Sequence, residues 1–232
     1  MNFDQLTGRT KDHLTWSDKL GFFIYPPAEI DLINLKKRAW KNGFDLQIAS
    51  GFRNYERQKV IWNDKVLGKR PVLDRDSNPI SPEKLKPYDL VLKILNWSAL
   101  PGASRHHWGT DFDIYCLKSL PRDYKLQLTP QEFAPGGVLF SFGSWLRENL
   151  QDFNFFCPYL KDRGGVLPEP WHIGHGPSST KFIASYTSEI YLQNLLESDL
   201  ELRSILQEKA LILYQNYFLK ISPNPWGTQS IS

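Results

Sequence analysis

Two short stretches of this chain concentrate histidines and carboxylates, and together they constrain the fold more than any other feature. The first, residues 104–113, reads Ser-Arg-His-His-Trp-Gly-Thr-Asp-Phe-Asp and holds two of the five histidines. The second, residues 169–175, reads Glu-Pro-Trp-His-Ile-Gly-His. They supply two imidazoles, a carboxylate ligand and a spare carboxylate, which a catalytic zinc ion and its general base require. We therefore expect a fold that brings the two stretches together around one metal ion.

The spacing inside the first stretch predicts a turn followed by a strand. From residue 112 to 116 every second side chain is apolar, whereas Asp111 and Asp113 share the opposite face. His106 and Asp113 are seven positions apart in the sequence. On an unbroken strand, side chains at an odd spacing point to opposite sides. A turn at Gly109 is therefore expected to fold His106 back toward Asp113.

Length and composition predict one sizeable domain, or one domain with appended helices. At 232 residues, with 41% hydrophobic and 14% aromatic residues, the chain can bury a packed core. The net charge is only +3 and no basic block with interleaved aromatics occurs, so we expect no nucleic-acid partner. The apolar runs are shorter than the roughly 20 residues of a membrane span, and residues 1–7 show no signal-peptide pattern. Cys116 and Cys157 are expected to be two buried thiols or one disulfide.

The apolar periodicity predicts an α+β fold, with a small antiparallel sheet flanked by helices and extra C-terminal helices. The expected helices cover residues 28–40, 55–67, 89–100, 138–150, 188–197 and 200–219. The expected strands cover residues 44–49, 112–116, 153–159 and 169–173. The remaining segments are expected to be an irregular arm at 1–28, loops at 69–88 and 117–135, and a turn or flap at 161–165.

A third motif, Ser50-Gly51-Phe52-Arg53, falls where the expected strand 44–49 meets the expected helix 55–67. The glycine allows a sharp exit from the strand. The long side chain of Arg53 can reach a cleft from such a junction. Arg53 is either a surface or ion-paired residue, or a residue that binds a substrate carboxylate. Its planar guanidinium group matches the geometry of a carboxylate.

The three motifs resemble those of the zinc D-alanyl-D-alanine carboxypeptidases and dipeptidases of the VanY/VanX type. Their LAS superfamily also includes the Hedgehog signalling domain. Residues 50–53 resemble the family's SGYR, residues 104–113 its SxHxxGxxxD, and residues 169–172 its ExWH, in the family order. The resemblance implies a zinc peptidase-like catalytic domain over residues 1–180. Residues 181–232 are then expected to form a C-terminal helical extension packed on the same domain.

Carried over residue by residue, the resemblance assigns a role to each matched position. It implies that His106, Asp113 and His172 bind one zinc ion and that Glu169 is the general base. Arg53 would bind the substrate or polarise its carbonyl group. The resemblance and the neighbouring sequence also imply substrate contacts, from Ser104, Gln58 and Trp171.

The other titratable residues of the two stretches are expected to support these roles. Asp111 is expected to be a hydrogen-bond acceptor behind a ligand or a structural residue, and His107 could orient a ligand or the substrate. Downstream of His172 the chain reads Ile-Gly-His, where the family often has an aromatic residue and an arginine. This departure leaves the wall of the pocket undefined, and His175 is either a pocket residue or a core or surface residue.

The resemblance implies a zinc-dependent peptidase that removes the terminal D-alanine from peptidoglycan peptides. Alternatives on the same polymer are an L,D-carboxypeptidase and an L-alanyl-D-glutamate endopeptidase. A non-catalytic zinc-binding module is the alternative of another class. The substrate favours the periplasm or cell envelope, while the absence of a visible signal peptide leaves the cytoplasm open. The sequence predicts no oligomeric state.

Overall fold

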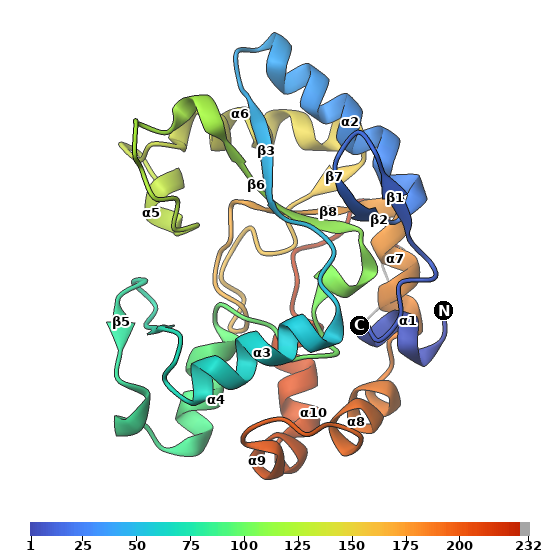
Figure 1. Cartoon of the computed structure of the whole chain (residues 1–232), viewed down its shortest axis with the longest axis vertical. Helices are drawn as coiled ribbons and strands as arrows, with labels where there is room; N and C mark the ends of the chain where they lie inside the picture. The colour runs from blue at the N-terminus through green and yellow to red at the C-terminus, as the bar shows by residue number, and fades with distance from the viewer. Residues whose placement is uncertain (228–232) are drawn as a thin grey trace.

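A four-stranded antiparallel sheet carries both functional stretches through the middle of the molecule (Figure 1). The structure is a computed structural model and describes residues 1–227. In order across the sheet, the strands are β3 (Leu46–Ser50), β6 (Asp111–Cys116), β8 (His172–His175) and β7 (Phe155–Phe156). The predicted α+β fold, with a small antiparallel sheet and flanking helices, is confirmed.

The register of the sheet brings the three motifs side by side. Asp113 of β6 lies opposite His172 of β8 on one side and opposite Ser50 of β3 on the other. The register shifts between Ile48 and Ser50, and such a bulge bends a strand and re-aims its side chains. The chain therefore leaves β3 at the point where Arg53 can approach the other two motifs.

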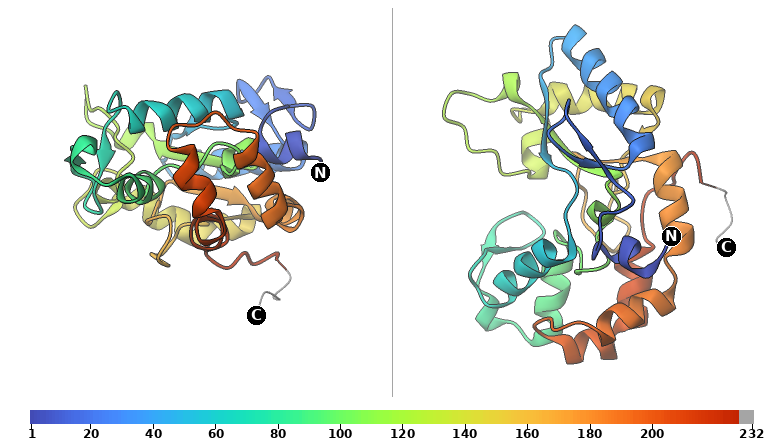
Figure 2. Two further views of the ribbon diagram at one scale, coloured as in Figure 1. Left: turned by 90° about the horizontal axis from the view of Figure 1, so that it is seen from below. Right: turned by 45° about the vertical axis from the view of Figure 1, so that its right-hand side comes forward.

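One buried cluster joins the sheet to α2 (Pro26–Lys41) and α6 (Phe140–Asn149). Figure 2 shows the ribbon from two further directions. Phe112, Ile114 and Cys116 are fully buried in this cluster. Their alternation confirms the predicted strand, whose other face carries Asp111 and Asp113.

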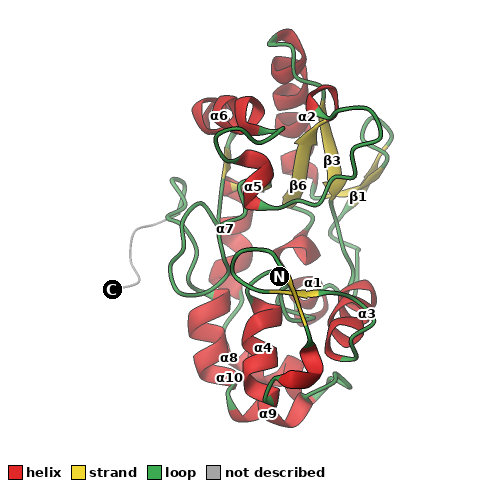
Figure 3. Cartoon of the chain, turned by 90° about the vertical axis from the view of Figure 1, so that its left-hand side faces the viewer, coloured by secondary structure: helices red, strands yellow, loops and turns green. Residues whose placement is uncertain are grey.

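A second buried cluster is helical and draws on both halves of the chain. The helices that contribute to it include α3 (Tyr55–Val66), α4 (Pro87–Leu95), α7 (Gly176–Ser185), α8 (Ser188–Leu196), α9 (Arg203–Glu208) and α10 (Ala210–Leu213). Figure 3 shows α4, α8, α9 and α10 gathered at the end of the molecule away from α2 and α6. The C-terminal helices thus share a core with α3, which follows the Arg53 motif, and the division at residue 180 stays a prediction.

The N-terminal arm predicted over residues 1–28 is wrong, because this stretch is structured. It contains α1 (Phe3–Thr7) and a hairpin of β1 (Thr15–Ser17) and β2 (Phe22–Ile24). Helix α2 already begins at Pro26, since proline has no N–H that the first helical turn would leave unpaired. Elements this short have too few residues for a periodic pattern.

The strand predicted at residues 169–173 begins later, at His172. The His172 N–H donates to the Glu169 carbonyl at 3.1 Å, which forms a turn instead of a strand. Pro170 inside this turn has no N–H for a sheet ladder. Glu169 therefore precedes β8, and the unpredicted helix α7 follows β8 directly.

Several loops and tail segments also differ from the prediction. The two proline-rich loops contain β4 (Val72–Leu73), β5 (Pro79–Ile80), a 3-10 turn (Pro82–Lys84) and α5 (Pro130–Phe133). The single helix predicted at 200–219 is divided into α9, α10 and a π-helical turn, Tyr214–Phe218. The break falls at Lys209, whose ψ of 10° lies outside the α region.

Both cysteines, Cys116 and Cys157, are free and buried, which confirms the thiol alternative. Burial raises the pKa of the Cys157 thiol to about 12, so this side chain stays protonated. Within residues 1–227, no helix combines the length and the apolar character needed to cross a membrane.

Candidate active site

Three predicted metal ligands meet at the sheet. His106 lies on a 3-10 turn (Arg105–Trp108), Asp113 on β6 and His172 on β8. His106 Nε2 is 3.3 Å from Asp113 Oδ2, and His172 Nδ1 is 3.2 Å from Asp113 Oδ1. All three side chains are buried, and one donor atom from each lies within 4.8 Å of the others.

These separations fit a zinc ion. Zinc–nitrogen and zinc–oxygen bonds of about 2.0–2.1 Å in a tetrahedron place neighbouring donor atoms about 3.3 Å apart. The distances of 3.3 and 3.2 Å, which end on the two different oxygens of Asp113, are close to this edge. Two imidazole nitrogens and one carboxylate form a donor set that leaves a fourth position open, as in catalytic zinc sites.

In both His106 and His172, the ring nitrogen that does not face Asp113 has a hydrogen-bond partner, which fixes the orientation of the ring. His106 Nδ1 is 3.0 Å from the Gly51 carbonyl, so this nitrogen carries the proton and Nε2 is free to bind a metal. His172 Nε2 is 3.1 Å from Asp111 Oδ2, which leaves Nδ1 for the metal. Arg105 Nε in turn donates to Asp111 at 2.6 Å. Asp111 is therefore an acceptor behind a ligand, one of its two predicted roles.

The charges around the cluster favour a cation at its centre. Burial alone would raise the pKa of Asp113, but His106 and His172 outweigh it and hold that pKa far below its usual range. Burial would lower the pKa of His172, but hydrogen bonds to Asp111 and Asp113 raise it to about 9. A bound metal ion would replace the proton on this imidazole, so metal binding would release protons.

Glu169 lies next to the ligand cluster without belonging to it. Its Oε2 is 3.4 Å from His172 Nδ1, and only 8% of the residue is exposed. Burial raises the pKa of Glu169 to about 8, against the opposing effect of His172. A carboxylate with a raised pKa can accept a proton near neutral pH and release it again, as a general base must.

Arg53 is fixed on the other side of the cluster. Its Nη1 donates to Gln58 Oε1 at 2.7 Å, and its Nη2 donates to Ser50 Oγ at 2.8 Å and lies 3.8 Å from Asp113 Oδ2. Gln58 is fully buried and its amide also donates to the Ala99 carbonyl at 2.7 Å. Gln58 therefore positions Arg53, and the predicted contact between Gln58 and the substrate stays a prediction.

His107 points away from the ligand cluster and holds the backbone of the Arg53 motif. The Gly102 N–H donates to His107 Nε2 at 3.0 Å, so His107 Nδ1 carries the proton and donates to the Arg53 carbonyl at 2.6 Å. Burial lowers the pKa of His107 to about 3 and keeps it neutral. The turn that separates His107 from β6 depends on Gly109, whose φ is +66° and whose Cβ would meet Leu14 at 2.6 Å.

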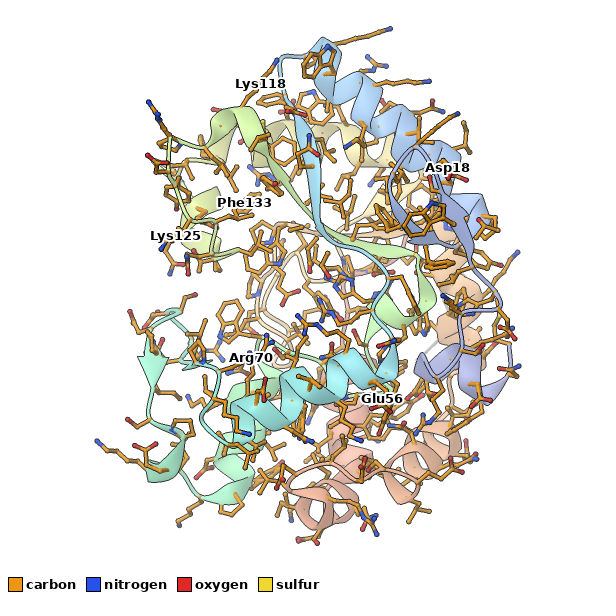
Figure 4. The ribbon with its side chains drawn as sticks, in the orientation of Figure 1. Asp18, Glu56, Arg70, Lys118, Lys125 and Phe133 are labelled. Carbon is orange, nitrogen blue, oxygen red and sulfur yellow. The ribbon has the colours of Figure 1, made fainter. Side chains whose placement is uncertain are left out.

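A cavity of about 250 Å³ opens beside these groups. Ser104, Arg53 and Glu169 line it, and Trp171 contributes to its wall although it is largely buried in the core. Figure 4 draws the side chains, with Phe133 of α5 in the upper part of the view and Arg70, which follows α3, in the lower part. The structure therefore brings the predicted ligands, base, arginine and serine to one cavity.

Residues 24–178 match the sequence profile of the family described as VanY, D-alanyl-D-alanine carboxypeptidase. The match covers more than half of the chain. The chain belongs to the VanY family. The resemblance predicted from the three motifs is thereby confirmed.

Other proteins share sequence or fold with this VanY-family chain. An uncharacterized protein of Haemophilus influenzae is 38% identical over 107 residues, which span 43% of this chain and 82% of that protein. A mutant of the vancomycin resistance D,D-pentapeptidase VanY, in complex with Zn(II), has a TM-score of 0.51 and 23% identity over 73% of this chain and 83% of that chain. VanYB in complex with D-alanine-D-alanine has a TM-score of 0.51 and 22% identity over 78% of this chain and 87% of that chain. The two structures show that the fold is shared.

The wall of the VanY-family cavity includes residues that sequence reasoning missed. The ring centroids of Tyr159 and His172 are 5.0 Å apart. Trp97 stacks on Trp171, with 6.4 Å between their ring centroids. The segment 69–100, which no motif explained, contributes Leu73, Ser77, Trp97, Ser98 and Ala99 to the lining. No pattern in this segment marked them, because tertiary packing alone carries them to the cavity.

His175 belongs to the core and not to the VanY-family cavity. Its Nδ1 is 2.7 Å from Ser178 Oγ and its Nε2 is 3.0 Å from Asp31 Oδ2. Asn154 Nδ2 donates to the same Asp31 oxygen at 2.8 Å. His175 is therefore a core residue, which is one of the two predicted alternatives. Its hydrogen bonds to Asp31 and Ser178 connect β8 with α2 and α7.

Proposed function

We propose that this VanY-family chain is a zinc-dependent carboxypeptidase that removes the terminal D-alanine from peptidoglycan stem peptides. The observation that carries the proposal is the arrangement of His106, Asp113 and His172 beside Glu169 and Arg53 in one cavity. The family description and the complexes of its structural neighbours with Zn(II) and D-alanine-D-alanine support this substrate class. We also propose that the enzyme acts in the cell envelope, where its polymer lies.

The residues around the cluster divide the chemistry between them. A bound zinc ion would supply Lewis-acid polarisation of the peptide carbonyl and a lowered pKa for water. Glu169 would take a proton from the attacking water and then deliver it to the nitrogen of the leaving D-alanine. Arg53, held by Gln58 and Ser50, would donate hydrogen bonds to the substrate oxygen on which negative charge develops. The buried walls keep bulk water away from these groups.

Defined muropeptides test the proposed function against its neighbours. Incubation with pentapeptide and tetrapeptide stems, followed by mass spectrometry, is expected to show loss of one alanine from the pentapeptide and an unchanged tetrapeptide. Loss of alanine from the tetrapeptide would identify an L,D-carboxypeptidase, and cleavage after L-alanine an endopeptidase. A protein that binds zinc and releases no product from any stem would be a non-catalytic zinc-binding module.

Replacing Asp111 by asparagine is expected to weaken zinc binding roughly 10- to 100-fold, because a carboxylate behind a metal-bound histidine fixes its ring and raises its basicity. Chelator competition measures this affinity. Asp31→Asn is a matched control, since Asp31 accepts from His175 at 3.0 Å as Asp111 does from His172 at 3.1 Å. Equal zinc affinity in the Asp111 variant and the wild type would contradict the assigned ligand geometry.

A further inference from the structure

Lys65 is a cation of the cavity to which neither the motifs nor the proposed mechanism assigns a role. It lies near the end of α3 and lines the same cavity as Arg53 and Glu169. Within residues 1–227 the Lys65 side chain forms no ion pair or hydrogen bond, and the largest charge effect on its pKa comes from Glu169. Burial lowers the pKa of Lys65 to about 8, so most of it is still protonated at neutral pH.

The two arginines that line the cavity each have partners in the protein. Arg105 pairs with Asp111 at 2.6 Å. Arg53 is held by Gln58, and its Nη2 also lies 3.8 Å from Asp113. Arg53 is thus held beside the ligand cluster, where the proposed mechanism uses it for the substrate oxygen, and Arg105 is paired behind the cluster. Among the lysines and arginines of residues 1–227 that line the cavity, Lys65 alone has a side chain with no ion pair.

The cavity also holds further hydrogen-bond donors without partners. Ser77 Oγ and Arg105 Nη1 are buried and have no hydrogen-bond partner among the described residues. Both residues line the cavity together with Lys65. A buried donor without a partner costs free energy, which a ligand that accepts hydrogen bonds recovers. A surplus of donors around a cation is the chemistry that selects carboxylates.

We propose that Lys65 binds a carboxylate of the substrate and thereby determines which peptides the site accepts. This inference rests on the proposed function and deepens it by naming the recognised group. Peptidoglycan stems offer that carboxylate from two sources. One is the free carboxyl terminus of the leaving D-alanine, and the other is the free carboxylate of the D-glutamate nearer the start of the stem.

The experiment measures binding in the zinc-loaded Glu169→Ala variant, so that the result does not depend on turnover. Lys65→Met is added because methionine keeps the unbranched stem and the helix propensity while removing the charge. Lys65→Arg restores a cation, and Lys69→Met is the matched control at an exposed lysine just beyond α3. Calorimetry compares three pentapeptides: the free acid, its C-terminal amide, and the peptide with the D-glutamate carboxylate amidated.

Lys65→Met is expected to raise the Kd of the free acid roughly 10- to 100-fold, the range for a charge-assisted hydrogen bond. Lys65→Arg is expected to recover most of the affinity, and Lys69→Met to leave it unchanged. If the C-terminal amide binds the parent variant weakly and does not respond to Lys65→Met, the terminal carboxylate is the partner. If the peptide with amidated D-glutamate behaves in that way, the upstream carboxylate is the partner.

Equal weakening of all three peptides by Lys65→Met would overturn the inference, and so would no weakening of any. Hydrolysis of muropeptides by the wild type is measured separately. A wild type that hydrolyses them, combined with binding that is insensitive to Lys65, leaves the proposed function standing and removes only the role of Lys65. A wild type that neither hydrolyses nor binds any of the peptides would remove both.

Discussion

Chelation of the metal is expected to abolish peptide hydrolysis, and zinc added afterwards is expected to restore it. Without a divalent ion the buried His106 and His172 pair with Asp113, at 3.3 and 3.2 Å. Such a closed cluster has no Lewis acidity and cannot lower the pKa of water. The activity of dialysed protein is therefore expected to fall to background, and elemental analysis is expected to find one zinc ion per active chain.

Magnesium provides the control for the zinc experiment. The cluster offers two imidazole nitrogens and one carboxylate, whereas magnesium prefers oxygen ligands in an octahedron. Magnesium added to the chelated protein is expected to leave it inactive. Full hydrolysis by metal-free protein, or purified protein that refuses zinc, would contradict the assigned site.

The sequence predicted the centre of the site well because its geometry is local. The odd spacing between His106 and Asp113 required a turn, and the chain makes it with a 3-10 turn and Gly109 at positive φ. The alternation after residue 112 then defined which face of β6 carries Asp113. Backbone periodicity and one glycine made the convergence of His106 and Asp113 possible, and the family resemblance implied it.

The walls of the cavity could not be predicted in the same way. Lys65 lies on a predicted helix, but its place in the same cavity wall as Glu169 depends on how α3 packs on the helical core. Ser77 has a φ of +66° and lies between two strands of only two residues each. Such positions are determined by tertiary contacts distant in sequence, which override local propensity.

Gln58 and Trp171 show a second limit of prediction. The motifs marked both as substrate contacts, but Gln58 is fully buried against Arg53, whereas Trp171, 5% exposed and stacked on Trp97, still lines the cavity. A residue that touches a ligand and one that positions its neighbour have the same spacing in a sequence. Burial and hydrogen-bond partners separate the two roles, and both come from the fold.

Glu169→Ala is expected to lower kcat roughly 10²- to 10⁴-fold, the usual contribution of a general acid–base group. Zinc content is expected to stay unchanged, because His106, Asp113 and His172 provide the ligands without Glu169. The fold is also expected to survive. Burial raises the pKa of Glu169 to about 8, so its charged form is unfavourable in this site and its removal relieves that cost.

Glu169→Gln separates proton transfer from packing, because glutamine keeps the size of the side chain but cannot accept the proton. Both variants are expected to lose kcat to a similar extent, while zinc content and peptide binding remain near those of the wild type. Steady-state kinetics on a defined pentapeptide, combined with zinc analysis of the same samples, measure these quantities. Wild-type kcat in either variant would show that the proton of the attacking water leaves by another route, whereas loss of zinc in both would make Glu169 a ligand or a residue that holds the ligands in place.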